Sequence, residues 1–312
     1  MTEAPARLSK AKNRPTAWLL HNPAARGAPD PTQLSRIARE LALAGFRVET
    51  AASDRPGAVT GLARHAASEG AERVVVCGGD GTVREAAQGL THTGVPLGIV
   101  PLGTANVLAR ELGLPLAPGP AAVVASRGAA RRVGVGLLNS GPVFTFCASA
   151  GLDALAVDRI DLRMKTQTGG WAYVHAALLA LLEEAVPSLL LESEEGVRAE
   201  ASQVFVLRAS RYGGDFRLCP EASVFSDTMR VLAVAPPLGA RLIPLLIQAM
   251  LGGIGTSPGV RSIETRALRI TTPHGFPIQA DGDVVGRIPA EIRTDPGSLA
   301  LVVPDPNGGS FP

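Results

Sequence analysis

Hydrophobic and polar positions follow two periods over residues 17–112. Short apolar runs bounded by polar residues or glycine predict buried strands at residues 17–20, 46–51, 73–77 and 95–101. Apolar residues at helical spacing, such as Leu34, Ile37 and Leu41, predict helices at residues 31–44, 57–68, 83–90 and 107–112. This alternation predicts a parallel sheet with right-handed crossovers, in which ligand-binding loops follow the carboxyl ends of the strands.

Residues at the ends of these runs support the helix boundaries. Asp30 precedes Pro31, which is the usual order of an N-cap residue and a proline at the first helical position. Gly45 and Gly70 stand where a left-handed residue commonly ends a helix. The capping residues and the periodicity therefore predict the same helices.

The pattern changes near Arg131, where helical periods give way to short β-like runs. These runs are residues 133–138, 143–148, 189–191, 201–209, 229–235, 268–272, 276–280, 291–294 and 299–302. Many short strands of this kind predict an antiparallel sandwich or barrel. Two apolar helical runs, 171–186 and 238–250, interrupt them. Either both cover the core of this half, or part of one lines an apolar substrate cleft or a membrane-facing surface.

Length and composition indicate two folded domains. The chain has 312 residues, of which 46% are hydrophobic and 19% are charged, as in folded proteins that form a core. We expect a disordered basic tail at 1–16, an α/β domain at 17–132, a β-sandwich domain at 133–304 and a second tail at 305–312. The last strand of the second domain is expected to pack back on the first domain.

Charge and cysteine content exclude several classes of protein. The formal net charge of +2 is too small to indicate a nucleic-acid partner. Cys77, Cys147 and Cys219 lie far apart without metal or disulfide spacing, which fits a reducing cytosol. The sequence shows no secretory signal and no apolar run of about 18 residues. We therefore expect a cytoplasmic protein without a transmembrane segment.

A glycine-rich segment gives the strongest indication of chemistry. Gly78-Gly-Asp-Gly-Thr82 follows the strand at 73–77 and precedes the helix at 83–90. Glycines let the backbone approach a phosphate, and the N–H groups at a helix start favour an anion. The carboxylate of Asp80 would repel a phosphate unless a cation or a hydroxyl lies between them, which favours catalysis over simple binding. The segment alone also fits a tight turn in which Thr82 caps the helix.

Polar residues follow two other predicted strands. Asn22 comes after the first strand, and Gly103-Thr-Ala-Asn106 comes after the fourth. Because the carboxyl ends of parallel strands meet at one edge of a sheet, these residues and the glycine-rich segment would line one phosphate-sized crevice. Taken alone, Gly103-Thr104 fits a structural cap equally well.

An acidic turn lies in the second half of the chain. Asp281-Gly-Asp283 separates two β-like runs, and Asp-Gly is a strong hairpin signal, so the turn alone is typical of a surface loop. Two carboxylates this close repel each other unless water or a cation screens them. Facing a phosphate-binding segment, they would serve as Mg²⁺ ligands or as the base for a hydroxyl nucleophile.

Several other catalytic patterns do not occur in the sequence. The five histidines show no ligand spacing. There is no Gly-x-Ser-x-Gly nucleophile elbow, no Walker A sequence and no Gly-x-Gly-x-x-Gly after a strand. These observations argue against a serine hydrolase, a P-loop enzyme and a dinucleotide-binding dehydrogenase.

Six segments in a fixed order resemble the diacylglycerol kinase and sphingosine kinase catalytic family, in particular its single-chain bacterial lipid kinases. They are Leu20-His-Asn-Pro-Ala-Ala-Arg-Gly27, Val76-Cys-Gly-Gly-Asp-Gly-Thr82, Leu97-Gly-Ile-Val-Pro-Leu-Gly-Thr-Ala-Asn106, Ala150-Gly-Leu-Asp153, Tyr212-Gly-Gly-Asp-Phe216 and Ile278-Gln-Ala-Asp-Gly-Asp283. The resemblance covers residues 17 to about 304. Gly-Gly-Asp-Gly-Thr also occurs in NAD kinases and, loosely, in phosphofructokinases, whereas the ordered set is more specific to lipid kinases.

The resemblance implies an α/β nucleotide domain and a β-sandwich domain, with ATP and Mg²⁺ in the cleft between them. It implies ATP contacts at Asn22, Pro23, Ala25, Arg26, Ser53, Gly78, Gly79, Asp80, Gly81, Thr82, Gly103, Thr104 and Asn106. Catalytic roles fall on Asp80, Asp281 and Asp283, and branches of the family place the general base either in the glycine segment or in the acidic turn. Asp281 and Asp227 would be metal ligands.

The chain departs from the family pattern at three positions. Asp283 stands where the family usually has Glu, which shortens the reach of this carboxylate by about one methylene. Val107 stands where many members have Asp, so no acid is available at this position. Some members hold a structural Mg²⁺ with an Asp-Gly-Leu loop, whereas Thr228 and Met229 follow Asp227 here.

The expected function is an ATP- and Mg²⁺-dependent lipid kinase, peripheral at the inner membrane surface. The sequence does not separate diacylglycerol, sphingoid base, ceramide and phosphatidylglycerol as the lipid acceptor. Edge strands of the second domain would allow a homodimer. The alternatives are a soluble small-molecule kinase similar to NAD kinase and a nucleotide- or lipid-binding protein without catalysis.

Overall fold

The computed structural model describes residues 14–25, 27–159, 187–236, 244–245, 247–249 and 251–305. These residues form two compact units. The first contains the chain up to Leu102, the segment Leu112–Arg131 and the chain from Leu299 onward, and the second contains Gly103–Glu111 and Arg132–Ser298. Most of the two predicted tails lies outside the described residues.

The first unit is built on a parallel sheet. Its strands are β1 (Thr16–His21), β2 (Arg47–Ala52), β3 (Arg73–Gly78) and β4 (Leu97–Pro101), in the order β2-β1-β3-β4. The end of β18 (Ala290–Val303) pairs in parallel with β4 through Leu301 and Leu97. β3 is apolar and almost wholly buried, as expected of a strand covered on both faces. The predicted parallel sheet is confirmed.

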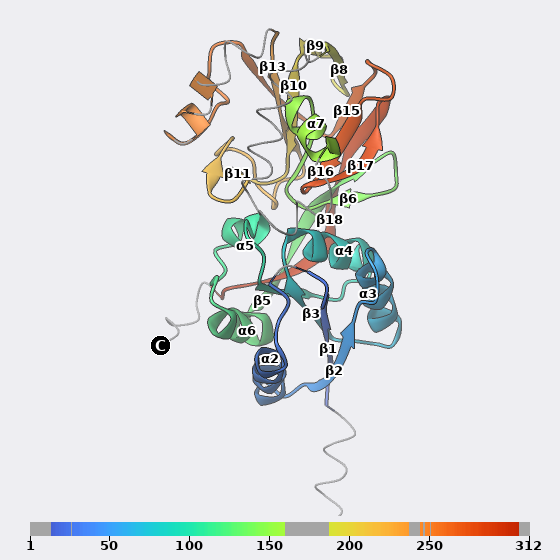
Figure 1. Ribbon diagram of the computed structural model, residues 1–312, viewed down its shortest axis with the longest axis vertical. Coiled ribbons are helices and arrows are strands. Elements are labelled where there is room, and N and C mark those ends of the chain that lie inside the picture. Colours follow the sequence, from blue (N-terminus) through green and yellow to red (C-terminus); the bar gives the residue numbers. More distant parts are fainter. Residues whose placement is uncertain are drawn as a thin grey trace, which may run out of the picture. The chain divides into compact units, whose positions relative to one another are not determined.

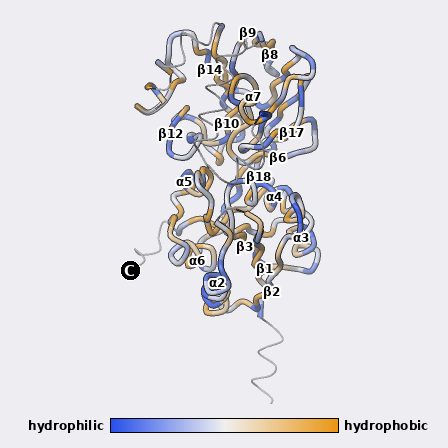
Figure 2. Tube along the Cα trace, in the orientation of Figure 1, coloured by the Kyte–Doolittle hydropathy of each residue, from blue (hydrophilic) through white to orange (hydrophobic). Residues whose placement is uncertain are grey.

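Helices cover both faces of this sheet (Figure 1). α2 (Pro31–Leu43) packs with α6 (Pro118–Arg127), and α3 (Ala58–Ser68) packs with α4 (Asp80–Leu90) on the opposite face. In Figure 2, β1 and β3 are largely hydrophobic, whereas α2 presents hydrophilic residues. The spacing analysis did not predict α6, whose first turn contains two prolines and a glycine.

Asp30 caps α2 as the sequence predicts. Its carboxylate accepts a hydrogen bond from Gln33 N at 2.8 Å, and Gln33 Oε1 accepts one from Asp30 N at 3.1 Å. This reciprocal capping box satisfies two backbone donors at the start of the helix. Gly45, at φ +100°, follows the C-cap of the helix.

Helix α4 begins at Asp80, three residues earlier than the spacing of its apolar residues predicts. Gly79 is its N-cap, in an extended conformation at φ −90° and ψ −175°. Thr82 in the first turn packs against Gly78, where an added Cβ would lie 2.7 Å from both Cβ and Oγ1 of Thr82. The expected glycine-rich loop is therefore wrong: the segment is a strand end, one capping residue and a helical turn.

The second unit contains two sheets. One is antiparallel, with the strand order β14-β13-β10-β7-β16-β17. Its strands are β7 (Cys147–Ala150), β10 (Gln203–Leu207), β13 (Met229–Val234), β14 (Val260–Thr265), β16 (Pro277–Ala280) and β17 (Asp283–Arg287). The other sheet has β5 (Ala129–Leu138), β6 (Val143–Phe144), β8 (Leu189–Ser193), β9 (Arg198–Ala201), β15 (Ala267–Ile270) and the first part of β18.

Apolar side chains of these two sheets share one core. Val206 and Ile278 come from the first of them, and Leu191, Leu268 and Ile292 come from the second. The predicted antiparallel β-sandwich is confirmed. The described part of the unit also contains two short helices, α5 (Val107–Glu111) and α7 (Leu152–Arg159), and a hairpin of β11 (Arg211–Tyr212) and β12 (Phe216–Arg217).

Some strand limits differ from the sequence prediction. Residues 291–294 and 299–302 belong to one strand, β18, and the run 143–148 is divided into β6 and β7. The division arises because the backbone between β6 and β7 turns toward a buried carboxylate described below. The apolar run 171–186 lies outside the described residues, and only part of 238–250 is described. The cleft that the resemblance implies stays a prediction.

Candidate active site

Three predicted site residues lie at the carboxyl ends of neighbouring strands in the first unit. His21, the last residue of β1, pairs in register with Ala52 of β2 and with Cys77 of β3. Asn22, Ser53 and Gly78 come next along the chain after these three residues. The sheet therefore brings them to one edge, as the sequence predicts for the loops of a parallel sheet (Figure 1).

The segment after β1 folds into a compact turn. Asn22 Oδ1 accepts a hydrogen bond from Ala24 N at 2.9 Å. Gly27 has φ +77°, and a Cβ there would overlap the backbone oxygen of Leu102, the residue after β4. The turn is therefore held against the end of β4. Of the predicted nucleotide ligands, it holds Asn22, Pro23 and Ala25, whereas Arg26 lies outside the described residues.

A buried hydroxyl and a buried ring nitrogen at this edge have no hydrogen-bond partner in the described part of the chain. Ser53 is only 4% exposed, and its Oγ is unpaired. Nδ1 of His21 is also unpaired, and burial lowers the pKa of this histidine, which keeps its ring neutral at pH 7. Because buried polar groups are normally paired, a polar ligand would account for the Ser53 hydroxyl.

The start of α4 adds backbone donors at the same edge. The first N–H groups of a helix have no intrahelical partners, and no side chain caps this helix at Gly79. Asp80 is half-buried in the first turn, where a carboxylate interacts favourably with the helix dipole. The donors fit a phosphate, and the carboxylate beside them fits a cation that the phosphate would share.

The segment Gly103–Asn106 belongs to the second unit and is shaped by Asn106. The Asn106 side chain accepts a hydrogen bond from Gly103 N at 2.9 Å and donates one to Gly103 O at 2.8 Å. Asn106 is buried, with φ +48°, whereas Thr104 is exposed. Both ends of the Asn106 amide therefore maintain the turn, and Thr104 is the accessible polar side chain on it.

Asp281 is buried, and its carboxylate accepts hydrogen bonds from residues 145–147, which lead from β6 into the start of β7. Oδ2 accepts hydrogen bonds from Thr145 N at 2.6 Å and Thr145 Oγ1 at 2.8 Å. Oδ1 accepts bonds from Phe146 N at 3.1 Å and Cys147 N at 3.0 Å. Burial raises the pKa of Asp281, and these four hydrogen bonds oppose that rise. With its acceptor positions occupied, the carboxylate supports the turn and does not suit a metal ligand.

Asp283, the other carboxylate of the acidic turn, has different surroundings. It is half-buried and is the first residue of β17. The two residues before it, Asp281 and Gly282, have positive φ values of +50° and +90°. Gly282 N donates a hydrogen bond to Gln279 Oε1 at 2.9 Å. One carboxylate of the turn is thus a buried anchor, and the other is partly accessible.

Asp227, the other predicted metal ligand, lies in a loop that binds a buried arginine. Its loop turns three backbone oxygens toward Arg208, which is fully buried: Nη2 donates to Val224 O at 3.1 Å and Ser226 O at 2.7 Å, and Nη1 donates to Thr228 O at 2.5 Å. Burial lowers the pKa of Arg208 to about 10, and the charge of Asp227 opposes this shift. The guanidinium of Arg208 is therefore the cation that these three backbone oxygens bind.

The described residues contain no group of three or more His, Cys, Asp and Glu side chains that could hold a metal ion.

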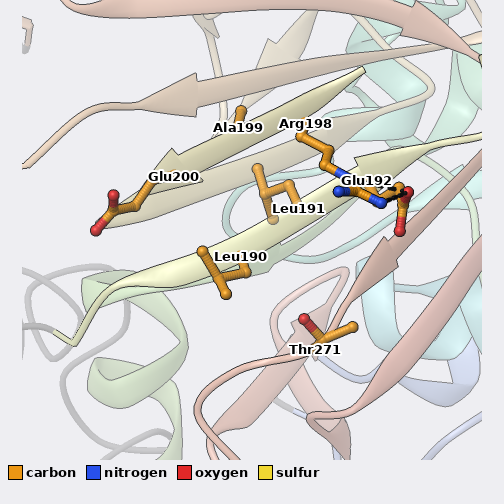
Figure 3. A pocket seen from close by; sticks show the side chains of 7 residues that line it. All are labelled: Leu190, Leu191, Glu192, Arg198, Ala199, Glu200 and Thr271. Carbon is orange, nitrogen blue, oxygen red and sulfur yellow. Dashed lines mark hydrogen bonds and ion pairs between the residues drawn. The ribbon is translucent and has the colours of Figure 1, made fainter. Parts of the chain in front are cut away.

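A surface pocket of about 440 Å³ lies apart from the predicted site residues (Figure 3). It is lined by Leu190, Leu191, Glu192, Arg198, Ala199, Glu200 and Thr271. Arg198 Nη2 lies 3.0 Å from Glu192 Oε1 across the β8–β9 hairpin. None of the predicted nucleotide-binding, catalytic or metal-binding residues lines this pocket, and we assign it no role.

The sequence analysis missed a cluster of buried polar side chains in the second unit. Asp153 and Tyr212 stand in segments that carry the family resemblance, but nothing marked them as contacting each other. Tyr212 OH donates a hydrogen bond to Asp153 Oδ2 at 2.9 Å, and Gln203 Nε2 donates one to Asp153 Oδ1 at 2.7 Å. A polar residue at a buried strand position was the available signal, and Gln203 and Gln279 show it.

Both units of the chain match known protein families. Residues 16–138 match the family model described as the diacylglycerol kinase catalytic domain. Residues 147–303 match the model described as the YegS C-terminal NAD kinase beta sandwich-like domain. The chain belongs to the diacylglycerol kinase catalytic-domain family.

Individual relatives agree with this assignment. The chain is 31% identical over 254 residues to a diacylglycerol kinase of Mycobacterium tuberculosis, and the alignment covers 78% of this chain and 81% of the relative. It is 24% identical over 293 residues to a diacylglycerol kinase of Bacillus subtilis, covering 92% and 96% of the two chains. An uncharacterized Synechocystis protein is 29% identical over 245 residues, and the chain spans 56% of its length.

A solved structure has the same fold. The crystal structure of a diacylglycerol kinase from Bacillus anthracis matches with a TM-score of 0.77 and 22% identity over 94% of this chain and 98% of that chain. Within the described residues, no helix is long and apolar enough to cross a membrane. Family membership supports a kinase of the lipid-kinase class.

Proposed function

We propose that the protein is an ATP- and Mg²⁺-dependent lipid kinase that transfers the γ-phosphoryl group to the hydroxyl of a diacylglycerol or sphingoid-type lipid. The observation that supports this most is the start of α4, where uncapped backbone donors and Asp80 lie at the same edge of the sheet as the buried, unpaired hydroxyl of Ser53. Phosphoryl transfer depends mainly on placement and charge neutralisation, so a small set of such groups suffices. The lipid acceptor implies work at the cytoplasmic surface of the membrane.

The nucleotide contacts proposed for the first unit are Asn22, Pro23, Ala25, Arg26, Ser53, Gly78, Gly79, Asp80, Gly81 and Thr82, and those proposed for the second are Gly103, Thr104 and Asn106. Backbone N–H groups at the start of α4 would bind phosphate oxygens. The Ser53 hydroxyl would donate to or accept from the nucleotide. Asp80 would hold Mg²⁺, which when bound neutralises phosphate charge.

In the second unit we assign the reacting role to Asp283 and a supporting role to Asp281. Asp283 is the partly accessible carboxylate and would accept the proton of the lipid hydroxyl. The filled carboxylate of Asp281 would fix the turn that carries it, in place of the metal-binding role expected from the sequence. The proposed reaction uses groups from both units.

Replacing Ser53 with alanine tests the nucleotide assignment. The Ser53 Oγ has no partner in the described part of the protein, so its removal is expected to leave the melting temperature within about 2 °C. Loss of one hydrogen bond to ATP would raise the KM for ATP by up to about tenfold. Ser68→Ala, at an exposed helical position, is the matched control and is expected to change neither quantity. An unchanged KM for ATP in Ser53→Ala would remove Ser53 from the site.

A comparison of lipid and water-soluble phosphate acceptors tests the proposed function itself. Labelled ATP and Mg²⁺ would be supplied with dioleoylglycerol or sphingosine in mixed micelles, and separately with NAD or glycerol. We expect label only in a lipid product. Label in NAD or glycerol and not in lipid would instead make the protein a soluble small-molecule kinase, a reading that the NAD-kinase-like sandwich of the second unit keeps open. ATP binding without any transfer would indicate a non-catalytic nucleotide-binding protein.

A further inference from the structure

Three neighbouring strands of the second unit carry one polar side chain each, at adjacent positions. Ser149 on β7 pairs in register with Gln279 on β16, and Gln203 lies at the start of β10 on the other side of β7. All three are at most 4% exposed. Polar groups buried in this way destabilise a sandwich unless they are paired, so their partners define the role of the cluster.

The common partner of these side chains is the carboxylate of Asp153 in the first turn of α7. Oδ1 accepts hydrogen bonds from Gln203 Nε2 and Ala154 N, both at 2.7 Å. Oδ2 accepts bonds from Ser149 Oγ, from Tyr212 OH at 2.9 Å and from Gln279 Nε2 at 3.4 Å. Five donors from five elements of the unit thus converge on one carboxylate.

The hydrogen bonds to Asp153 require the backbone at Gly151 to lie close to Gln203. Gly151, between β7 and α7, has φ +132°, and a Cβ there would overlap Oε1 of Gln203. The glycine therefore lets the chain between β7 and α7 pass close to Gln203, which places Asp153 within reach of the three strands. Because its oxygens are engaged by the protein, Asp153 is suited to hold other groups in place and not to bind a substrate.

Gln279 connects this carboxylate to the acidic turn. Its Nε2 donates to Ser149 Oγ at 2.5 Å, and its Oε1 accepts the N–H of Gly282 at 2.9 Å. Gly282 is the central residue of Asp281-Gly-Asp283, and the β16–β17 register shifts at Ile278 and Gln279. The amide of Gln279 is therefore fixed at one end by the network and holds the turn at the other end.

The turn is thus supported from two directions. The carboxylate of Asp281 is bound by the backbone between β6 and β7, and Gly282 is bound by Gln279. Together these contacts fix the two residues that precede Asp283, the first residue of β17. A carboxylate one methylene shorter than Glu has less freedom to adjust, so the position of its backbone decides where its oxygens lie.

We propose that Gln279 is a positioning residue for Asp283. It does not touch the reactants: Ser149 and the Asp153 carboxylate hold its amide, and the amide sets the acidic turn at the geometry that phosphoryl transfer requires. The inference rests on the proposed kinase function, because it concerns the rate of that reaction.

Two glutamine variants separate positioning from stability. Gln279→Leu and Gln203→Leu each remove one buried amide that donates to Asp153, but only Gln279 also contacts the acidic turn. We expect similar losses of melting temperature in both. Gln279→Leu is expected to lower kcat by about 10- to 100-fold with the KM for ATP within about twofold, because displacement of a catalytic group affects the reaction and not nucleotide binding. Gln203→Leu is expected to keep kcat within about twofold.

The assay uses dioleoylglycerol in mixed micelles with the full-length protein. Equal losses of kcat in the two variants, or an unchanged kcat in Gln279→Leu, would overturn the positioning role while leaving the lipid kinase function intact. A wild-type protein that phosphorylates no lipid would overturn the proposed function, and the positioning role with it. A loss of kcat confined to Gln279→Leu supports both.

Discussion

Asp80→Asn is expected to lower kcat by about 10³-fold and to leave the fold intact. The substitution removes the negative charge at the start of α4 while retaining a side chain of the same size. If Asp80 places Mg²⁺ against the transferred phosphate, the loss of charge removes an interaction on which phosphoryl transfer depends. If Asp80 only stabilises the helix dipole, the cost is about 1 kcal/mol of unfolding free energy and the rate is unchanged.

The two roles of Asp80 are separated by measuring steady-state kinetics and urea unfolding on the same preparations. Asp54→Asn is the matched control, since it changes the same functional group on the surface of the same unit, where Asp54 pairs with the exposed side chain of Arg55. We expect wild-type kcat from this control. A folded Asp80→Asn protein with wild-type kcat would exclude Asp80 from the reaction.

Arg208→Met is expected to cause the largest loss of stability, about 3–5 kcal/mol of unfolding free energy. Methionine fills much of the same volume, but the oxygens of Val224, Ser226 and Thr228 would lose their buried donors. Gly134 would be left opposite a shorter side chain, since a Cβ at this position would overlap the guanidinium of Arg208. Urea unfolding measures the loss, and Arg198→Met, at an exposed arginine, is expected to cost less than about 1 kcal/mol.

The same loop predicts that folding stability does not depend on a divalent metal. In the absence of nucleotide, the urea midpoint of the wild type is expected to be the same in MgCl₂ and in EDTA, because Arg208 already supplies the positive charge that the loop oxygens bind. A midpoint raised by Mg²⁺ and returned to the EDTA value by Asp227→Asn would instead place a metal at this loop.

The α/β architecture of the first unit follows directly from its sequence. Apolar runs and helical spacing predict β1 to β4 and α2 to α4, and Asp30 with Pro31 predicts the start of α2. The start of α4 lies earlier than predicted, because three glycines within five residues suggest a loop. In the structure, the missing side chain at Gly78 serves to admit Thr82 of a helical turn.

The roles within the acidic turn were not predictable from spacing. Asp281 and Asp283 are two residues apart and chemically identical, yet the donors that fill Asp281 come from Thr145, Phe146 and Cys147, more than 130 residues earlier. Long-range contacts of this kind depend on which strands become neighbours, and the order β7-β16-β17 is a property of the sandwich and not of any local pattern.

The role of Arg208 was likewise not predictable from the sequence pattern around it. It stands within a predicted strand at residues 201–209, where an arginine suggests a surface position, but the side chain is fully buried. Only the folded loop at Val224–Thr228 provides the oxygens that make burial of its charge tolerable.

Transfer of labelled γ-phosphate from ATP to dioleoylglycerol, measured with Mg²⁺ and with EDTA, tests the lipid kinase function most directly. Wild type, Asp80→Asn and Asp283→Asn would be assayed together, and the product identified by mass spectrometry as a lipid phosphomonoester. The account predicts a phosphorylated lipid from the wild type with Mg²⁺, and none with EDTA or from either variant. Clear ATP binding by the wild type with no phosphorylated lipid, across sphingosine, ceramide and phosphatidylglycerol as well, would contradict it.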